Sequence, residues 1–138
     1  MPLVPLRQTA AAALVVLLLG CRVASAERCV ITGQRYNLVA DVVTWSMRIE
    51  SGHRCIRGVR YGNVEFENLT LILPPQSGEV ALSGWGFTYT ADEGFQGQDQ
   101  FIVGVSGKIK KIHGTSTIRV FVSVFRSEPS HAAALHQN

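Results

Sequence analysis

The apolar and polar positions after residue 27 alternate along most of the chain. Residues 43–49 show this most clearly, with apolar side chains at Val43, Trp45, Met47 and Ile49. A period of two is typical of a strand with one buried face, whereas a helix repeats about every 3.6 residues. Similar alternation predicts strands at 64–73, 80–82, 85–90, 101–105 and 115–125. We therefore predict an all-β domain, an antiparallel sandwich or barrel.

Interruptions of the alternation predict bulges and turns. Leu69, Leu71 and Leu73 continue the second strand in shifted phase, which indicates a β-bulge near Glu67-Asn68. Pro74-Pro75 ends that strand, because proline has no N–H group for the ladder. A later turn is expected at residues 91–94, where Gly94 can adopt a positive φ.

The first 26 residues have a different pattern. Arg7 precedes an apolar run over residues 10–19, and Ala24-Ser25-Ala26 follows it. A charged start, an apolar middle and an A-x-A site form a secretory signal peptide. The alternatives are a buried helix or a membrane anchor, although the run is about half the length that spans a bilayer. We expect removal of residues 1–26 and a mature, periplasmic or secreted chain that begins at Glu27.

Leu18-Leu19-Gly20-Cys21 resembles the lipobox of bacterial lipoproteins, in which the cysteine is lipidated. That family usually has a small residue where Leu19 stands, so cleavage after Ala26 and a lipid anchor at Cys21 stay as two alternatives. Either route leaves Cys29 and Cys55 in the domain. In an oxidising compartment this pair predicts one disulfide, with two free buried thiols as the alternative.

The charge of the chain changes when the leader is removed. Without Arg7 and Arg22, residues 27–138 hold 11 basic and 10 acidic residues. A nearly neutral domain lacks the electrostatic footprint of nucleic-acid binding, and no later apolar segment is long enough to cross a membrane. We therefore expect one domain over residues 27–125, no nucleic-acid partner, no transmembrane segment in the mature chain, and a flexible tail over 126–138.

One stretch of the C-terminal half resembles a known family. The matching residues are Pro75, Gly78, Val80, Phe87, Tyr89, Thr90, Gly94, Phe95, Gly97, Asp99 and Phe101. They resemble the repeated core of bacterial Ig-like and cadherin-like domains, and the strand IRVFVSV resembles the closing strand of that family. The resemblance implies an Ig-like β-sandwich with an adhesive, scaffolding or envelope role and a protein or envelope partner. Such domains often occur in tandem, whereas this chain holds one copy.

Two surface sites are candidates for binding. Asp92, Glu93 and Asp99 place three carboxylates within eight residues, which are ligands that calcium prefers. Cadherin-like relatives sometimes bind calcium between repeats. The alternative is a solvated acidic turn in which Asp99 holds the loop.

A basic patch is the other candidate. Its members are Arg48, Arg54, Arg57 and Arg60, with Lys108, Lys110 and Lys111 as further candidates. Guanidinium groups bind phosphate and carboxylate, so the patch suits a phosphate-bearing envelope polymer or an acidic partner. Ordinary surface charge that protects strand edges is the alternative.

The sequence gives no catalytic signature. It contains no recognisable nucleophile elbow, Ser–His–Asp order or phosphate loop, so we predict a protein that is not an enzyme and uses no cofactor.

Trp45 and Trp85 are expected in the core, with an exposed carbohydrate-binding pair as the alternative. The predicted function is a binding or structural role in the envelope or extracellular space. A calcium- or small-ligand-binding module that uses the acidic turn is the second hypothesis, and an unrecognised hydrolase is the third.

Overall fold

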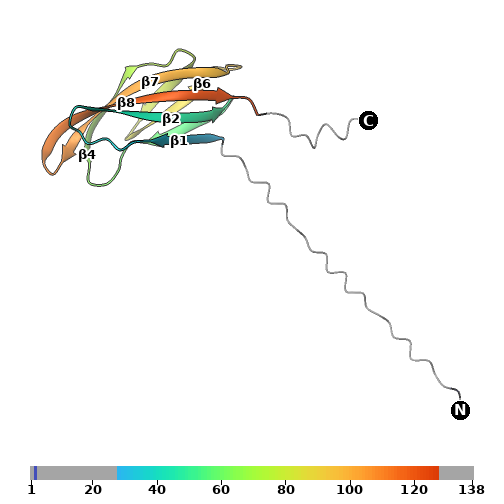
Figure 1. Cartoon of the computed structure of the whole chain (residues 1–138), viewed down its shortest axis with the longest axis horizontal. Helices are drawn as coiled ribbons and strands as arrows, with labels where there is room; N and C mark the ends of the chain where they lie inside the picture. Colours follow the sequence, from blue (N-terminus) through green and yellow to red (C-terminus); the bar gives the residue numbers. More distant parts are fainter. Residues whose placement is uncertain (1, 3–27, 128–138) are drawn as a thin grey trace.

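The computed structural model describes Pro2 and residues 28–127, and the chain forms two β-sheets that face each other (Figure 1). The strands are β1 (Cys29–Gly33), β2 (Asp41–Glu50), β3 (Arg54–Gly58), β4 (Glu65–Leu73), β5 (Gly78–Ser83), β6 (Gly86–Ala91), β7 (Gly97–Ile109) and β8 (Ile112–Phe125). The prediction of an all-β domain is confirmed. The predicted signal peptide, the candidate anchor Cys21 and the tail beyond Ser127 lie outside the described residues, apart from Pro2.

One sheet has the strand order β1-β2-β8-β7-β4 and the other has the order β3-β6-β5. Every pairing is antiparallel except β2 with β8, which run parallel from Asp41 opposite Ser116 to Glu50 opposite Phe125. The prediction of a wholly antiparallel arrangement is therefore wrong at this pair. The parallel pairing is possible because the chain passes through β3–β7 before β8 returns beside β2.

The core lies between the sheets and follows the predicted alternation. The five-stranded sheet contributes Val43, Trp45, Met47, Ile49, Phe101, Val103, Val105, Ile118, Val120, Val122 and Val124, and the three-stranded sheet contributes Val80, Phe87 and Tyr89. Aromatic rings join the two layers, because the Phe101 ring stacks on Tyr89 at 5.8 Å and meets Phe87 edge-on at 5.1 Å. These large rings dominate the buried area that stabilises the fold.

A disulfide between Cys29 and Cys55 joins β1 in one sheet to β3 in the other, with a Cα–Cα distance of 5.6 Å. The predicted pairing is therefore present. Such a cross-link stabilises by restricting the unfolded chain, by about 3 kcal/mol for a loop of this length in the chain-entropy model.

Several predicted interruptions occur where expected. The register of β4 shifts between Phe66 and Asn68, β4 ends at Leu73 before the prolines, and Gly94 has φ +76°. Two strands, β1 and β3, were not predicted. The last hairpin is also longer than expected, because Gly107 and Gly114 pair within it and do not break it.

The two ends of the molecule differ in what they carry. β1 begins and β8 ends at the same end, where Cys29, Ile49 and Val124 lie in register. The opposite end, here called the distal end, carries residues 34–40, residues 59–64, the β5–β6 turn and the β7–β8 turn at Lys110-Lys111 (Figure 1). Within the described part of the chain, no helix is long and apolar enough to cross a membrane.

Candidate binding surfaces

Arg57 and Trp45 form the floor of a cleft at the open side of the sandwich. Arg57 pairs with Phe87 across the β3–β6 ladder, and its Cζ lies 5.6 Å from the Trp45 ring in the opposite sheet. The indole Nε1 donates to the Gln34 carbonyl at 2.8 Å. Gly33 lies beside this ring, and a Cβ at Gly33 would overlap the indole. The glycine therefore makes room for the tryptophan on which the guanidinium stacks.

Tyr36 fixes the wall of the cleft formed by residues 59–61. Its hydroxyl donates to the Val59 carbonyl at 2.7 Å, and its ring meets that of Tyr61 edge-on at 4.8 Å. Burial, assisted by Tyr61, raises the pKa of Tyr36 well above its ordinary value, so the phenol remains a neutral donor at physiological pH. Arg35 completes the wall, with its Cζ 5.7 Å from the Tyr61 ring.

Trp85 stands on the far side of Arg57, on the β5–β6 turn. Its carbonyl accepts the Val59 N–H at 2.8 Å, and its ring lies 5.4 Å from that of Phe66. The side chain is 44% exposed, so the prediction that both tryptophans belong to the core is wrong for Trp85. Gly84 and Trp85 form the two-residue turn between Ser83 and Gly86, so Trp85 lies outside the strand ladder, which the alternation alone did not reveal.

These residues border two adjoining hollows. One has a volume of about 270 Å³ between Trp45 and Tyr61, and the other has about 440 Å³ beside Trp85. Both are lined by Arg57, Gly58 and Arg60. Below, "the basic cleft" means both hollows together with the following side chains: Arg35, Arg57, Arg60, Trp45, Tyr61 and Trp85.

The arginines of the basic cleft have no ion-pair partner within 4 Å among the described residues, and the carboxylate that acts electrostatically on Tyr61 in the cleft wall is that of Asp41. Among the described residues, the ion pairs within 4 Å are those of Glu67 with Lys108 and with His113. Three guanidinium groups therefore keep their hydrogen-bond donors available for an anion.

The structure divides the predicted basic patch. Arg57 and Arg60 lie together in the cleft, joined by Arg35, which the sequence did not single out. Arg48 lies on the outer face of the five-stranded sheet, where its Cζ is 4.5 Å from the Phe125 ring. Arg54 precedes Arg57 by three residues on β3, so the two side chains leave opposite faces of the strand. Lys108, Lys110 and Lys111 belong to the β7–β8 hairpin.

The acidic turn is divided as well. Asp92 and Glu93 are exposed, whereas Asp99 is 8% exposed and accepts four hydrogen bonds. The donors are the N–H groups of Gln76, Ser77 and Gln100 and the Tyr89 hydroxyl, at 2.9–3.0 Å. Asp99 thus fastens the loop between β4 and β5, which is a different loop from the acidic turn that it was expected to hold. No cluster of three or more His, Cys, Asp or Glu side chains suited to a metal ion occurs in the described part.

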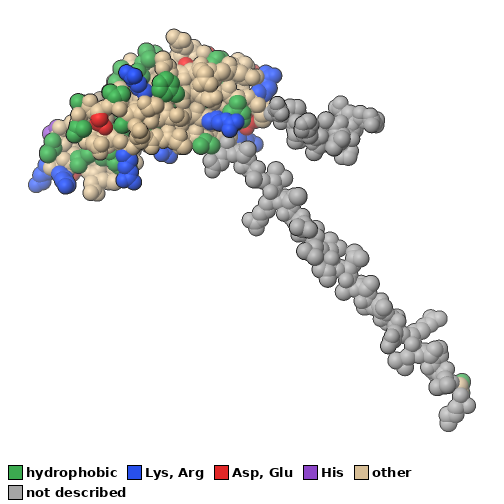
Figure 2. Space-filling view, in the orientation of Figure 1, with side chains coloured by type: hydrophobic (Ala, Val, Ile, Leu, Met, Phe, Trp, Pro, Cys, Tyr) green, Lys and Arg blue, Asp and Glu red, His purple; other side chains and the backbone are tan. Residues whose placement is uncertain are grey.

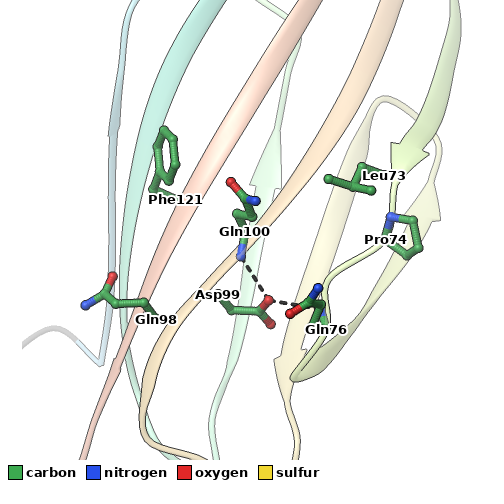
Figure 3. A pocket seen from close by; sticks show the side chains of 7 residues that line it. All are labelled: Leu73, Pro74, Gln76, Gln98, Asp99, Gln100 and Phe121. Carbon is green, nitrogen blue, oxygen red and sulfur yellow. Dashed lines mark hydrogen bonds between the residues drawn. The ribbon is translucent and has the colours of Figure 1, made fainter.

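A third hollow, of about 340 Å³, lies beside Phe121 on the outer face of the five-stranded sheet (Figure 3). Leu73, Pro74 and the amide side chains of Gln76, Gln98 and Gln100 line it. Its charged member, Asp99, already holds Gln76 and Gln100, as the dashed lines show. This hollow offers amides and one aromatic ring, and no arginine or lysine lines it, in contrast to the basic cleft.

The comparisons with known proteins give no family for the chain. No protein-family model matches it, and a search of curated proteins gives no match.

Proposed function

We propose that this chain is an exported Ig-like β-sandwich that binds an anionic polysaccharide in the basic cleft. The observation that carries the proposal is the convergence of three guanidinium groups, none with a carboxylate within 4 Å among the described residues, and three aromatic side chains around adjoining hollows. The leader pattern and the disulfide between the sheets support export. The two facing sheets and the match over Pro75–Phe101 support an Ig-like relationship.

The chemistry of the cleft matches an acidic sugar polymer. Guanidinium groups bind carboxylate, sulfate or phosphate through paired N–H donors, and their delocalised charge is weakly hydrated. The half-exposed faces of Trp85 and Tyr61 offer flat apolar surfaces against which the C–H face of a sugar ring can pack. The two hollows share Arg57, Gly58 and Arg60, so a sugar chain that extends from one hollow into the other passes both arginines.

Retention and titration with defined polymers test this function. Polygalacturonate supplies carboxylates, heparin supplies sulfates, and neutral dextran serves as the uncharged control. We expect binding to the acidic polymers that weakens as salt increases. Replacing Arg57 and Arg60 by alanine should weaken binding by about a hundredfold, at roughly one tenfold step for each lost charged contact.

A matched control separates the cleft from general positive charge. The double variant Arg48→Ala and Arg54→Ala removes the same charge outside the cleft and should change affinity less than about threefold. An equal loss in both double variants would refute the cleft as the site. We also propose that binding occurs without catalysis, so the polymer should keep its length after prolonged incubation, and any shortening would contradict this part.

A further inference from the structure

The β7–β8 turn holds two lysines in an unusual backbone conformation. Ile109 pairs with Ile112, and the two residues between them, Lys110 and Lys111, have φ values of +50° and +66°. Two-residue turns of this kind normally contain Asn or Gly, because at positive φ the Cβ atom crowds the following carbonyl oxygen, which glycine avoids and which asparagine offsets by local hydrogen bonds. Two consecutive lysines in this conformation are a local departure of the kind that concentrates at functional positions.

Residues 38–40 are fixed beside this hairpin. The Ala40 N–H donates to the Thr115 carbonyl at 2.9 Å, and the Leu38 N–H donates to Ser116 Oγ at 2.9 Å. Val39 lies between these two anchors, and its own N–H donates to the Asp41 carboxylate. The backbone is held on both sides of Val39, yet the side chain is 73% exposed. Ile112, at the tip of the hairpin, is 72% exposed.

Lysines adjoin Ile112 at the tip of the hairpin, whereas the charged group in contact with the Val39 backbone is the Asp41 carboxylate. Glu67 pairs with Lys108 and His113, whereas Lys110 and Lys111 have no carboxylate within 4 Å among the described residues. Figure 2 shows Lys and Arg side chains beside hydrophobic ones at the end of the molecule that carries the β7–β8 turn. Isolated β-branched side chains among lysines on a protruding tip form no broad flat patch. A stable protein interface needs about 1,000 Å² of buried surface, whereas a lipid surface accepts separate apolar side chains.

We propose that the distal end docks on an anionic lipid surface. Val39 and Ile112 enter the headgroup layer, and Lys110 and Lys111 lie against the lipid phosphates with their aliphatic stems directed along the interface. The basic cleft also lies toward the distal end, but the membrane contact uses other side chains, those of Val39, Ile112 and the Lys110-Lys111 turn, and it goes beyond the proposed function. The rigid anchoring of residues 38–40 lets the apolar side chains insert without a prior ordering step.

Vesicle flotation tests the proposal, and it uses the full-length gene product in the form isolated after expression. Vesicles of phosphatidylethanolamine with phosphatidylglycerol should capture the protein, and vesicles of phosphatidylcholine alone should not. The double charge variant Lys110→Glu and Lys111→Glu should lower the fraction bound at least tenfold. The double apolar variant Val39→Ser and Ile112→Ser should do the same, because each pair is needed.

Controls of equal charge and similar exposure keep the test specific. Arg54→Glu with Arg126→Glu makes the same change of net charge away from the hairpin, and Ile72→Ser removes an apolar side chain that is 55% exposed on β4. Both should bind within about twofold of the original chain. Equal loss in these controls, or no capture by the anionic vesicles, would overturn the proposal. A dimer in sedimentation velocity that disappears in the Val39→Ser and Ile112→Ser variant would also overturn it, in favour of self-association.

Polysaccharide binding and membrane docking should be lost in different variants. Arg57→Ala with Arg60→Ala should weaken polysaccharide binding by about a hundredfold and leave vesicle capture unchanged, because the lysine turn remains. The lysine variant should behave in the opposite way. If the arginine variant instead loses both activities, the membrane contact lies in the cleft and the proposed docking end is refuted.

Discussion

Replacing Asp99 by alanine should destabilise the fold strongly, because this one side chain satisfies four donors. The Tyr89 hydroxyl is buried with its ring and would be left without its acceptor. An unsatisfied buried donor costs about 1–3 kcal/mol, and a hydrogen bond to a charged group contributes about 1.5–3 kcal/mol. The amides of Gln76, Ser77 and Gln100 are partly buried, so water replaces part of their loss. We therefore expect the free energy of unfolding to fall by about 3–5 kcal/mol.

Chemical denaturation measures this loss directly, and thermal melting should show a fall of about 12 °C or more for a domain of this size. Asp92→Ala is the control, because Asp92 is an exposed acid in the preceding turn and should change stability by less than about 0.5 kcal/mol. Tyr89→Phe removes the buried hydroxyl. In that background, Asp99→Ala should cost about 1–2 kcal/mol less, since no orphaned donor remains.

The same variants decide whether Asp99 acts as a brace or as a calcium ligand. A brace predicts the same loss of stability in excess calcium and in a chelator, because its partners are three amides and a phenol. A calcium ligand predicts that the variant differs from the original chain only when calcium is present. That result, or a loss below about 1 kcal/mol in both conditions, would refute the argument from hydrogen bonding.

Three further predictions concern other supports of the fold. Replacing Cys29 and Cys55 by serine should lower the free energy of unfolding by about 2–5 kcal/mol, and alkylation of two thiols in the native, unreduced chain would contradict the disulfide. Gly114→Ala should destabilise by more than about 2 kcal/mol in urea denaturation because its Cβ would overlap the Leu38 carbonyl, whereas Gly58→Ala, which faces open space, should change stability by less than about 1 kcal/mol. Burial alone would raise the pKa of Asp41, but hydrogen bonds from Ser116, Asn37 and Val39 outweigh it and hold the pKa below 3.8. Its stabilisation is therefore present above that pH and lost as the pH falls through the folded pKa, so Asp41→Asn should be less stable at pH 7 and show a flatter acid limb in pH-dependent melting.

Alternation predicted the long strands because their residues divide cleanly between core and solvent. Val43–Ile49 and Ile118–Val124 bury every second side chain, and each long strand contains enough repeats for the period to be unambiguous. β1 and β3 contain five residues each, and β3 buries one, Cys55. One buried position cannot show an alternation of buried and exposed residues, so the pattern of apolar residues does not predict β3.

The predicted strands 101–105 and 115–125 are too short at the last hairpin for a different reason. The segment between them contains Gly107 and Gly114, which pair with each other inside the ladder. Their lack of a side chain admits neighbouring chain segments, since a Cβ at Gly114 would overlap Leu38 and one at Gly107 would overlap Glu65. Close approach between segments far apart in sequence is a tertiary property.

The grouping of arginines in the basic cleft also arises from tertiary contacts, so the sequence did not predict it. Arg57 and Arg60 are neighbours on the chain, and their charge was noticed in the sequence. Arg35 joins them because Tyr36 reaches across to hold Val59, a contact over 23 residues. The stacking of Arg35 on Tyr61 and of Arg57 on Trp45 leaves no local pattern. Sequence therefore indicated a type of chemistry, and the folded chain determined which arginines share it.

The polarity of the molecule connects the open question of N-terminal processing to the proposed membrane contact. β8 spans 14 residues, so the distal end lies roughly 45 Å from the end where β1 begins, at about 3.3 Å per strand residue. If Cys21 carries a lipid, the residues from Cys21 to Arg28 reach at most about 25 Å even when fully extended. A domain tethered at its β1 end therefore cannot stand upright on its distal end, and it brings that end to the same bilayer only by lying along the surface. Cleavage after Ala26 leaves the domain free to dock end-on on any anionic surface, whereas a lipid anchor allows end-on docking only on a second one. Mass spectrometry of the mature N-terminus distinguishes the two processing routes. A lipidated chain that stands end-on on its own membrane, with its β1 end roughly 45 Å above the bilayer, would refute this geometric argument.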